Sequence, residues 1–123
     1  MSALDGLATQ LRGEQTPISP HVVEPEAASL SGEYAALFES IQEGYLLHYG
    51  EPRLLAGHDD DLALLAGDYL YALGLAHLAE FGDDRSIALL ADLISRCAQL
   101  HAEGRGADAA RLWPEAAAVL GLD

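Results

Sequence analysis

Lysine is absent from the sequence, and the 6 basic residues, all arginines, stand against 20 acidic ones, for a formal net charge of −14. A surface of this charge repels the phosphates of nucleic acids and of anionic membranes. Nucleic acid is therefore not an expected partner. The charge is compatible with a basic protein or a metal ion as a partner, and equally with an acidic surface that only keeps the protein soluble.

Cysteine is nearly absent as well, because Cys97 is the single one and cannot form an intrachain disulfide. The N-terminal stretch MSALDGLATQLRG lacks the basic start and apolar run of a secretory signal. No window approaches the roughly 20 consecutive apolar residues of a membrane span. We therefore expect a protein without a membrane span, located in the cytoplasm.

The β-branched residues are scarce, while alanine and leucine dominate a composition that is 50% hydrophobic. This composition favours helices over strands, and 123 residues suffice for one domain. We predict an all-α fold, a small bundle of about four helices with an extended N-terminal segment. The bundle helices are expected at about 31–49, 60–81, 83 or 84 to 103, and 107–120. Ser31 is the expected cap of the first, and a break or bend is expected near Trp113 in the last, because Pro114 suits the first turn of a new helical segment.

The N-terminal segment is predicted to be distinct from this bundle. A short helix over residues 2–12 has an apolar face formed by Leu4, Leu7, Ala8 and Leu11. Three prolines follow it and forbid a continuous helix: Pro17, Pro20 and Pro25. We divide the chain into residues 1–28, the short helix with its linker, and 29–123, the bundle. On this division residues 1–28 are dispensable for folding and free to dock on another protein.

The helix expected at 60–81 is apolar nearly all round, which is typical of a helix at the centre of an assembly. Gly67 and Gly74 lie seven residues apart and would let a second helix approach closely. Because three flanking helices of so small a chain would not cover its whole circumference, we expect a homodimer, or a hetero-oligomer with a larger protein. The expected interface comprises Gly67, Tyr71, Gly74 and Leu78.

The stretch HDDDLALLAGD, residues 58–68, carries the acidic groups that could hold a metal ion. The weak candidates are Asp60, Asp61 and Asp68, although Asp61 and Asp68 would lie about 10 Å apart along a helix, too far to share one ion. The alternative interpretation is structural: Asp59 to Asp61 cap a helix, and Asp68 is a buried polar group bonded to a neighbouring helix.

Other polar residues give weaker signals. His77 lies among apolar neighbours in the sequence, so we expect it in the core or at an interface. Cys97 and His101 share a helix face at a spacing that suits zinc, but no further ligands accompany them. Glu39 and Glu43 have the same spacing, without the Glu-x-x-His motif of a di-iron bundle. We predict no catalytic residue and no cofactor.

The stretch LALLAGDYLYALGLAHLAEFGDDRSIALLADLISRCAQLHAEG, residues 62–104, resembles a helical pair of trans-type polyprenyl diphosphate synthases. It is equally similar to the non-catalytic small component of two-component heptaprenyl diphosphate synthases. Catalytic members carry two Asp-Asp-x-x-Asp motifs that hold magnesium, because the ions neutralise the departing diphosphate. In this sequence the position of the third aspartate is taken by Ala63 after Asp59-Asp60 and by Ile87 after Asp83-Asp84. Neither motif is therefore complete.

The resemblance and its departures together favour a non-catalytic association protein, similar to an accessory subunit of a polyprenyl diphosphate synthase. One alternative is an adaptor that docks through its N-terminal helix. The other is a small metal- or diphosphate-dependent enzyme with a site at a dimer interface, and magnesium is expected only in that case.

Overall fold

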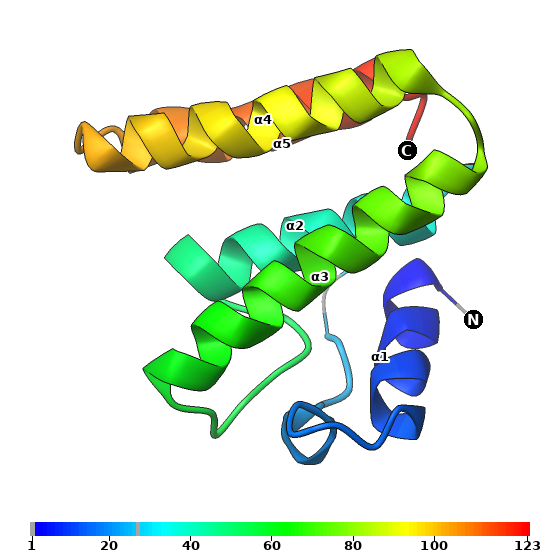
Figure 1. The fold of residues 1–123 in the computed structure, drawn as a ribbon, viewed down its shortest axis with the longest axis vertical. Coiled ribbons are helices and arrows are strands. Elements are labelled where there is room, and N and C mark those ends of the chain that lie inside the picture. Colours follow the sequence, from blue (N-terminus) through cyan, green and yellow to red (C-terminus); the bar gives the residue numbers. More distant parts are fainter. Residues whose placement is uncertain (1, 27) are drawn as a thin grey trace.

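The structure, a computed structural model, describes residues 2–26 and 28–123. The all-α prediction is confirmed: this part of the chain has five α-helices and no strand, one helix more than the expected bundle of about four. The elements are α1 (Ala3–Gly13), the 3-10 helix η1 (Ser19–His21), α2 (Ala35–Tyr49), α3 (Asp60–Glu80), α4 (Asp84–Ala102) and α5 (Gly106–Val119) (Figure 1).

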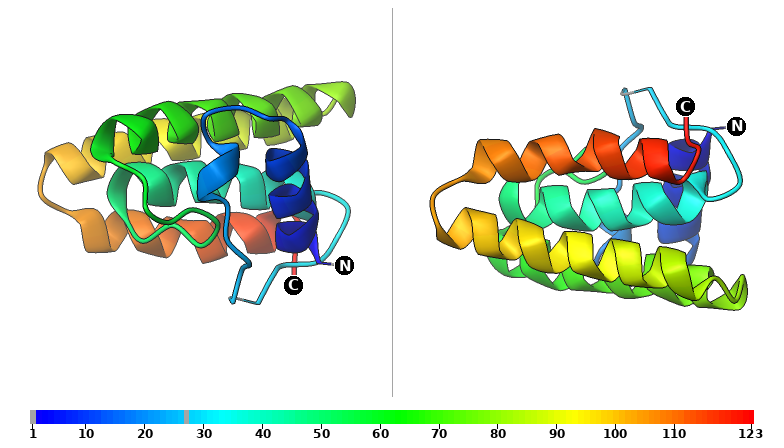
Figure 2. Two further views of the ribbon diagram at one scale, coloured as in Figure 1. Left: turned by 90° about the horizontal axis from the view of Figure 1, so that it is seen from below. Right: turned by 90° about the horizontal axis from the view of Figure 1, so that it is seen from above.

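The central helix of the molecule is α2. It packs closely against α3, and both views of Figure 2 show it in the middle of the molecule, with α5 on one side and α3 together with α4 on the other. Buried side chains therefore surround its axis, and they include two glutamates: Leu37, Phe38, Glu39, Ser40, Ile41, Glu43, Tyr45 and Leu47. Within the chain, the central place that we expected for residues 60–81 belongs to α2.

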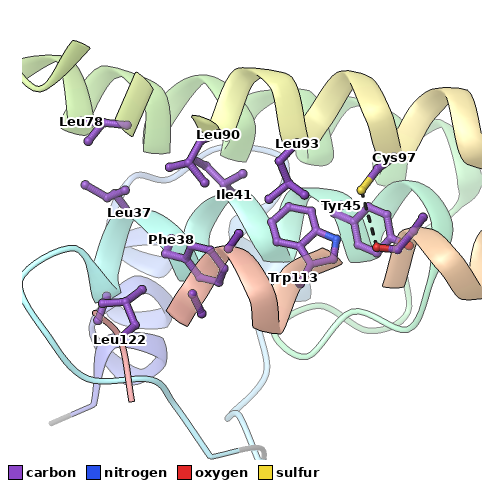
Figure 3. Packing of buried hydrophobic residues seen from close by; sticks show 14 residues of the cluster. Leu37, Phe38, Ile41, Tyr45, Leu78, Leu90, Leu93, Cys97, Trp113 and Leu122 are labelled. Atoms are coloured by element: carbon purple, nitrogen blue, oxygen red, sulfur yellow. Dashed lines mark hydrogen bonds between the residues drawn. The ribbon is translucent and has the colours of Figure 1, made fainter. Parts of the chain in front are cut away.

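The larger hydrophobic cluster joins α2 to α4 and α5 (Figure 3). Trp113 is its largest member, and it packs edge-on against Phe38 with 5.8 Å between the ring centroids. Tyr45 lies on the other side of the indole at a centroid distance of 5.0 Å. Aromatic pairs in this range add to the burial energy, so Trp113 stabilises the packing of α5 on α2 together with the buried alanines of α5.

A second cluster lies at the N-terminal end of the chain, where α1 crosses the α2–α3 pair (Figure 1). The apolar face of α1 is buried there as predicted for an amphipathic helix, but its neighbours belong to the bundle: Leu47, Leu54, Leu55, Ala66 and Leu70. Polar contacts hold the same segment. Tyr69 of α3 donates to Glu14 at 2.7 Å, and Ser19 donates to the carbonyl of Leu11 at 2.6 Å. α1 thus contributes core side chains that pack against residues of the bundle, while the division of the chain at residue 28 stays a prediction.

Capping explains two of the helix starts. Asp59 accepts from the backbone N–H of Leu62 at 2.8 Å, and Asp83 accepts from that of Ser86 at 3.1 Å. The hydrogen bonds from Ser86 hold the pKa of Asp83 below its usual range, because they favour the carboxylate. Both acids therefore stabilise the helix ends that they precede.

Two boundary predictions were wrong. Ser31 does not cap α2, because α2 begins after Tyr34 and has no side-chain cap. The backbone of Ser31 instead forms two hydrogen bonds with the backbone of Asp123, at 3.0 and 3.1 Å. The break expected near Trp113 does not occur, since α5 runs on through Pro114. Pro114 is exposed, so its ring does not disturb the core that α5 covers.

Candidate functional site

The acidic residues at the start of α3 do not converge. Asp59, Asp60 and Asp61 are all exposed, and Asp59 is occupied as the helix cap. In the described part of the chain no group of three or more histidine, cysteine, aspartate or glutamate side chains is placed to hold a metal ion. The weak metal candidates Asp60, Asp61 and Asp68 are thus not brought together.

Asp68 bonds to a neighbouring helix, as the structural interpretation predicted, but it is exposed and not buried. Its carboxylate lies 3.3 Å from Nε2 of His48 on α2. The same nitrogen lies 3.2 Å from the carbonyl of Leu64. His48 fits against α3 because Gly67 has no side chain, since a Cβ at Gly67 would lie 2.3 Å from the imidazole.

The glycines of α3 do allow a close helix approach, but the approaching helix is α2 of the same chain. A Cβ at Gly74 would lie 2.4 Å from Ile41 and 2.8 Å from the carbonyl of Leu37, and Gly44 of α2 faces α3 in the same way. Leu78 is fully buried in the core and Tyr71 is half-buried between the helices. The residues expected at a dimer interface therefore serve the α2–α3 contact.

Cys97 and His101 have separate environments. The Cys97 thiol is buried, which raises its pKa, and it donates to the carbonyl of Ala109 at 3.8 Å. His101 lies 2.8 Å from the hydroxyl of Tyr45 and stacks on Tyr49 with 4.1 Å between centroids. His77, expected as a core or interface histidine, is half-buried. Cys97 and His101 thus pack the end of the bundle near Tyr49, whereas His77 lies by Ala36 and Leu37 near the start of α2.

The side of α3 that points away from α2 is exposed and almost wholly apolar. We call it the outer face of α3, and its apolar members are Leu64, Leu65, Ala72, Ala76 and Ala79. Leu64 and Leu65 are 55% and 60% exposed, and the exposed carboxylates Asp61 and Asp68 lie along the same face. A monomeric soluble protein rarely leaves such a strip uncovered.

By length and composition, α3 is also the one helix of the described residues that could span a membrane, in contrast to the expectation from window counting. A core helix of a soluble protein passes the same test. A single helix of this kind, packed on α2 through its glycines, is consistent with a chain that does not cross a membrane.

A buried ionic cluster lies on the opposite side of α2. Glu39 and Glu43 are 1% and 0% exposed, and Arg53 reaches both of them from the loop that follows α2. Glu43 accepts from the backbone N–H groups of Arg53 and Leu54 at 2.7 and 2.8 Å and from Nε of Arg53 at 2.9 Å. The cluster fixes the chain as it leaves α2, because three short bonds converge on one carboxylate.

Glu39 is held less tightly than Glu43. Its bonds from Nη1 of Arg53 measure 3.3 and 3.4 Å, and those from Ser29 and the backbone of Leu30 are equally long. The spacing of Glu39 and Glu43 was visible in the sequence, but their partner was not. Two acids one turn apart in an apolar helix, followed by a lone arginine after the helix end, are the signal that could have identified the cluster.

Beside Glu39 the surface opens into a cavity of about 240 Å³ between α2, α5 and the segment before α2. Its lining combines the aromatic rings of Phe38 and Trp113 with the polar side chains of Glu39, Gln42 and Arg53. The structure thus offers two candidate sites, an apolar surface on α3 and a small polar-floored cavity on the other side of α2.

No protein-family model, curated protein or solved structure matches this chain. The functional argument therefore depends on the geometry of these two sites.

Proposed function

We propose that the chain works by association, and that the outer face of α3 is the surface on which a second copy binds. The observation that supports this proposal is the exposure of Leu64 and Leu65 on a helix whose opposite side is already packed. Complete burial of a leucine side chain contributes about 1.5–3 kcal/mol, and Leu64 and Leu65 still have 55% and 60% of their surface to bury in a dimer.

The outer face of α3 is suited to pack against the same face of a second copy, because its two halves carry side chains of different size. Leucines occupy the N-terminal half of the outer face, and Ala72, Ala76 and Ala79 occupy the C-terminal half. In an antiparallel pair of α3 helices that cross at Ala72, Leu65 of each copy would lie over Ala79 of the other. Small residues at the crossing let the backbones approach, and an isologous contact of this kind closes on itself.

Sedimentation velocity at tens of micromolar tests the proposal, with the expected result of a dimer. Ala72→Glu should give a monomer with unchanged helical circular dichroism, because the residue is exposed within the chain and a buried charge at the crossing is costly. Ala110→Glu is the matched control, since it makes the same change on an exposed position of α5, across the molecule from α3 (Figure 2). A wild-type monomer would overturn the homodimer and leave the face for a different protein.

The narrower proposal is that the association partner is, or resembles, the catalytic subunit of a polyprenyl diphosphate synthase. It is supported by the likeness of residues 62–104 alone. On this proposal the purified chain forms no product from isopentenyl diphosphate and an allylic diphosphate. Magnesium-dependent product formation by a preparation free of other synthases would contradict it and favour the enzyme alternative.

The adaptor alternative gains no support from the fold. The apolar face of α1, which an adaptor would present to its partner, is buried against Leu47 and Leu70 of its own chain.

A further inference from the structure

The ionic cluster on α2 lacks one positive charge. Glu39 and Glu43 are almost completely buried, yet Arg53 is the single base that pairs with them in the described part of the chain. Two carboxylates against one guanidinium leave a net charge of −1 on this cluster. A buried charge without compensation is costly, so a further cation would stabilise the site.

The distances show which carboxylate carries the uncompensated charge. Every bond to Glu43 is between 2.7 and 2.9 Å, whereas every bond to Glu39 is between 3.3 and 3.4 Å. Charge-assisted hydrogen bonds are normally as short as those to Glu43. Glu39 is also the carboxylate that lines the cavity.

The walls of the cavity suit the same kind of ligand. Phe38 and Trp113 supply aromatic rings, and aromatic rings attract cations through their π-electrons. The indole nitrogen of Trp113 lies on the side of Tyr45 and Cys97 (Figure 3), so the ring and not its N–H contributes to the wall. Leu30 and Pro114 complete an apolar rim that would accept the hydrocarbon part of a ligand.

We propose that this cavity binds a small organic ammonium ion, with the ammonium group bonded to Glu39 and the hydrocarbon part against Phe38 and Trp113. The volume of about 240 Å³ fits a ligand of the size of one side chain with its amine, and not a nucleotide or a second protein chain. An anionic ligand is disfavoured, because it would add a negative charge beside two carboxylates even though Nη2 of Arg53 has no hydrogen-bond partner in the described chain.

The probe for the test is 2-phenylethylammonium, compared with its neutral isostere 2-phenylethanol and with the anion 3-phenylpropionate at equal ionic strength. Trp113 is the only tryptophan of the chain and lines the cavity, so its fluorescence reports occupancy directly. The expected result is saturable binding of the ammonium, at least about tenfold tighter than the alcohol, and no binding of the carboxylate.

Two variants separate charge from fold. Glu39→Gln should weaken ammonium binding by about tenfold or more, while Glu33→Gln, which removes one exposed negative charge, should leave binding unchanged. If the Glu39→Gln protein lost its helical circular dichroism, ammonium binding would be measured with Ala28→Phe instead. Ala28 is exposed at the cavity, so a phenyl ring there should keep the ammonium ligand out of the cavity without touching the core. Absence of ammonium binding, equal binding of the alcohol, or full binding by a folded Glu39→Gln or Ala28→Phe protein would overturn the proposal.

Discussion

At the scale of single residues, Arg53 has the largest predicted effect on stability. Replacing it with alanine leaves Glu39 and Glu43 buried without a cation, and breaking a buried ion pair in this way costs about 3–5 kcal/mol. Urea denaturation followed by circular dichroism measures the loss. Arg105→Ala is the control, because Arg105 is exposed and its ion pairs are at the surface. Equal midpoints for the two variants would contradict the structural role of the cluster.

Alanine substitutions at two helical glycines, Gly74 and Gly13, should change the stability of the fold in opposite directions. Gly74→Ala places a Cβ against Ile41 and the backbone of Leu37, so we expect a destabilisation of about 1–3 kcal/mol from overpacking. Gly13→Ala meets no atom within 4 Å and lies in α1 at a negative φ. It should stabilise the fold by about 0.4–1 kcal/mol, because alanine restricts the unfolded chain. Thermal unfolding midpoints that move in the same direction would contradict this account.

At the scale of elements, α1 is part of the folded core. A chain that begins at Ala28 lacks Leu4, Leu7 and Leu11, each buried to at least 94%, and exposes the bundle leucines that they cover. Burying a leucine contributes about 1.5–3 kcal/mol, so the shortened chain should unfold at a clearly lower urea concentration. An unchanged midpoint would support the separation at residue 28 that the prolines suggested.

The helices themselves followed from local patterns, whereas their mutual arrangement did not. The start of α3 agrees with its acidic cap, and α4 ends within a residue of the expected position, because capping residues and glycines act on their immediate neighbours. Burial depends on the whole chain. The apolar circumference of α3 suggested a central helix, but the central helix is α2, whose two glutamates are buried only because Arg53 pairs with them. No local pattern contains that pairing.

At the scale of the whole molecule, the net charge opposes the proposed dimer. Each copy carries −14, and the outer face of α3 brings Asp61 and Asp68 towards the partner. Salt at about 0.1 M screens charges beyond about 10 Å, so association should become tighter as sodium chloride is added. Sedimentation equilibrium at low and high salt measures the change. Weaker association at high salt would indicate that attraction between opposite charges, and not apolar burial, holds the copies together.

The division of the apolar core into two clusters has a consequence for how the native protein opens. The α4–α5 hairpin belongs to one cluster and α1 to the other, while α2 contributes side chains to both. Either flank can therefore detach while the other still holds α2, which makes the flanks separate cooperative units in the native ensemble. Amide hydrogens of α1 and of α5 should exchange with deuterium through two distinct sub-global openings, and those of α2 only when the whole molecule unfolds. Substituting Leu7 by alanine should accelerate exchange in α1 and leave the protection of α5 unchanged, which mass spectrometry of labelled peptides would resolve.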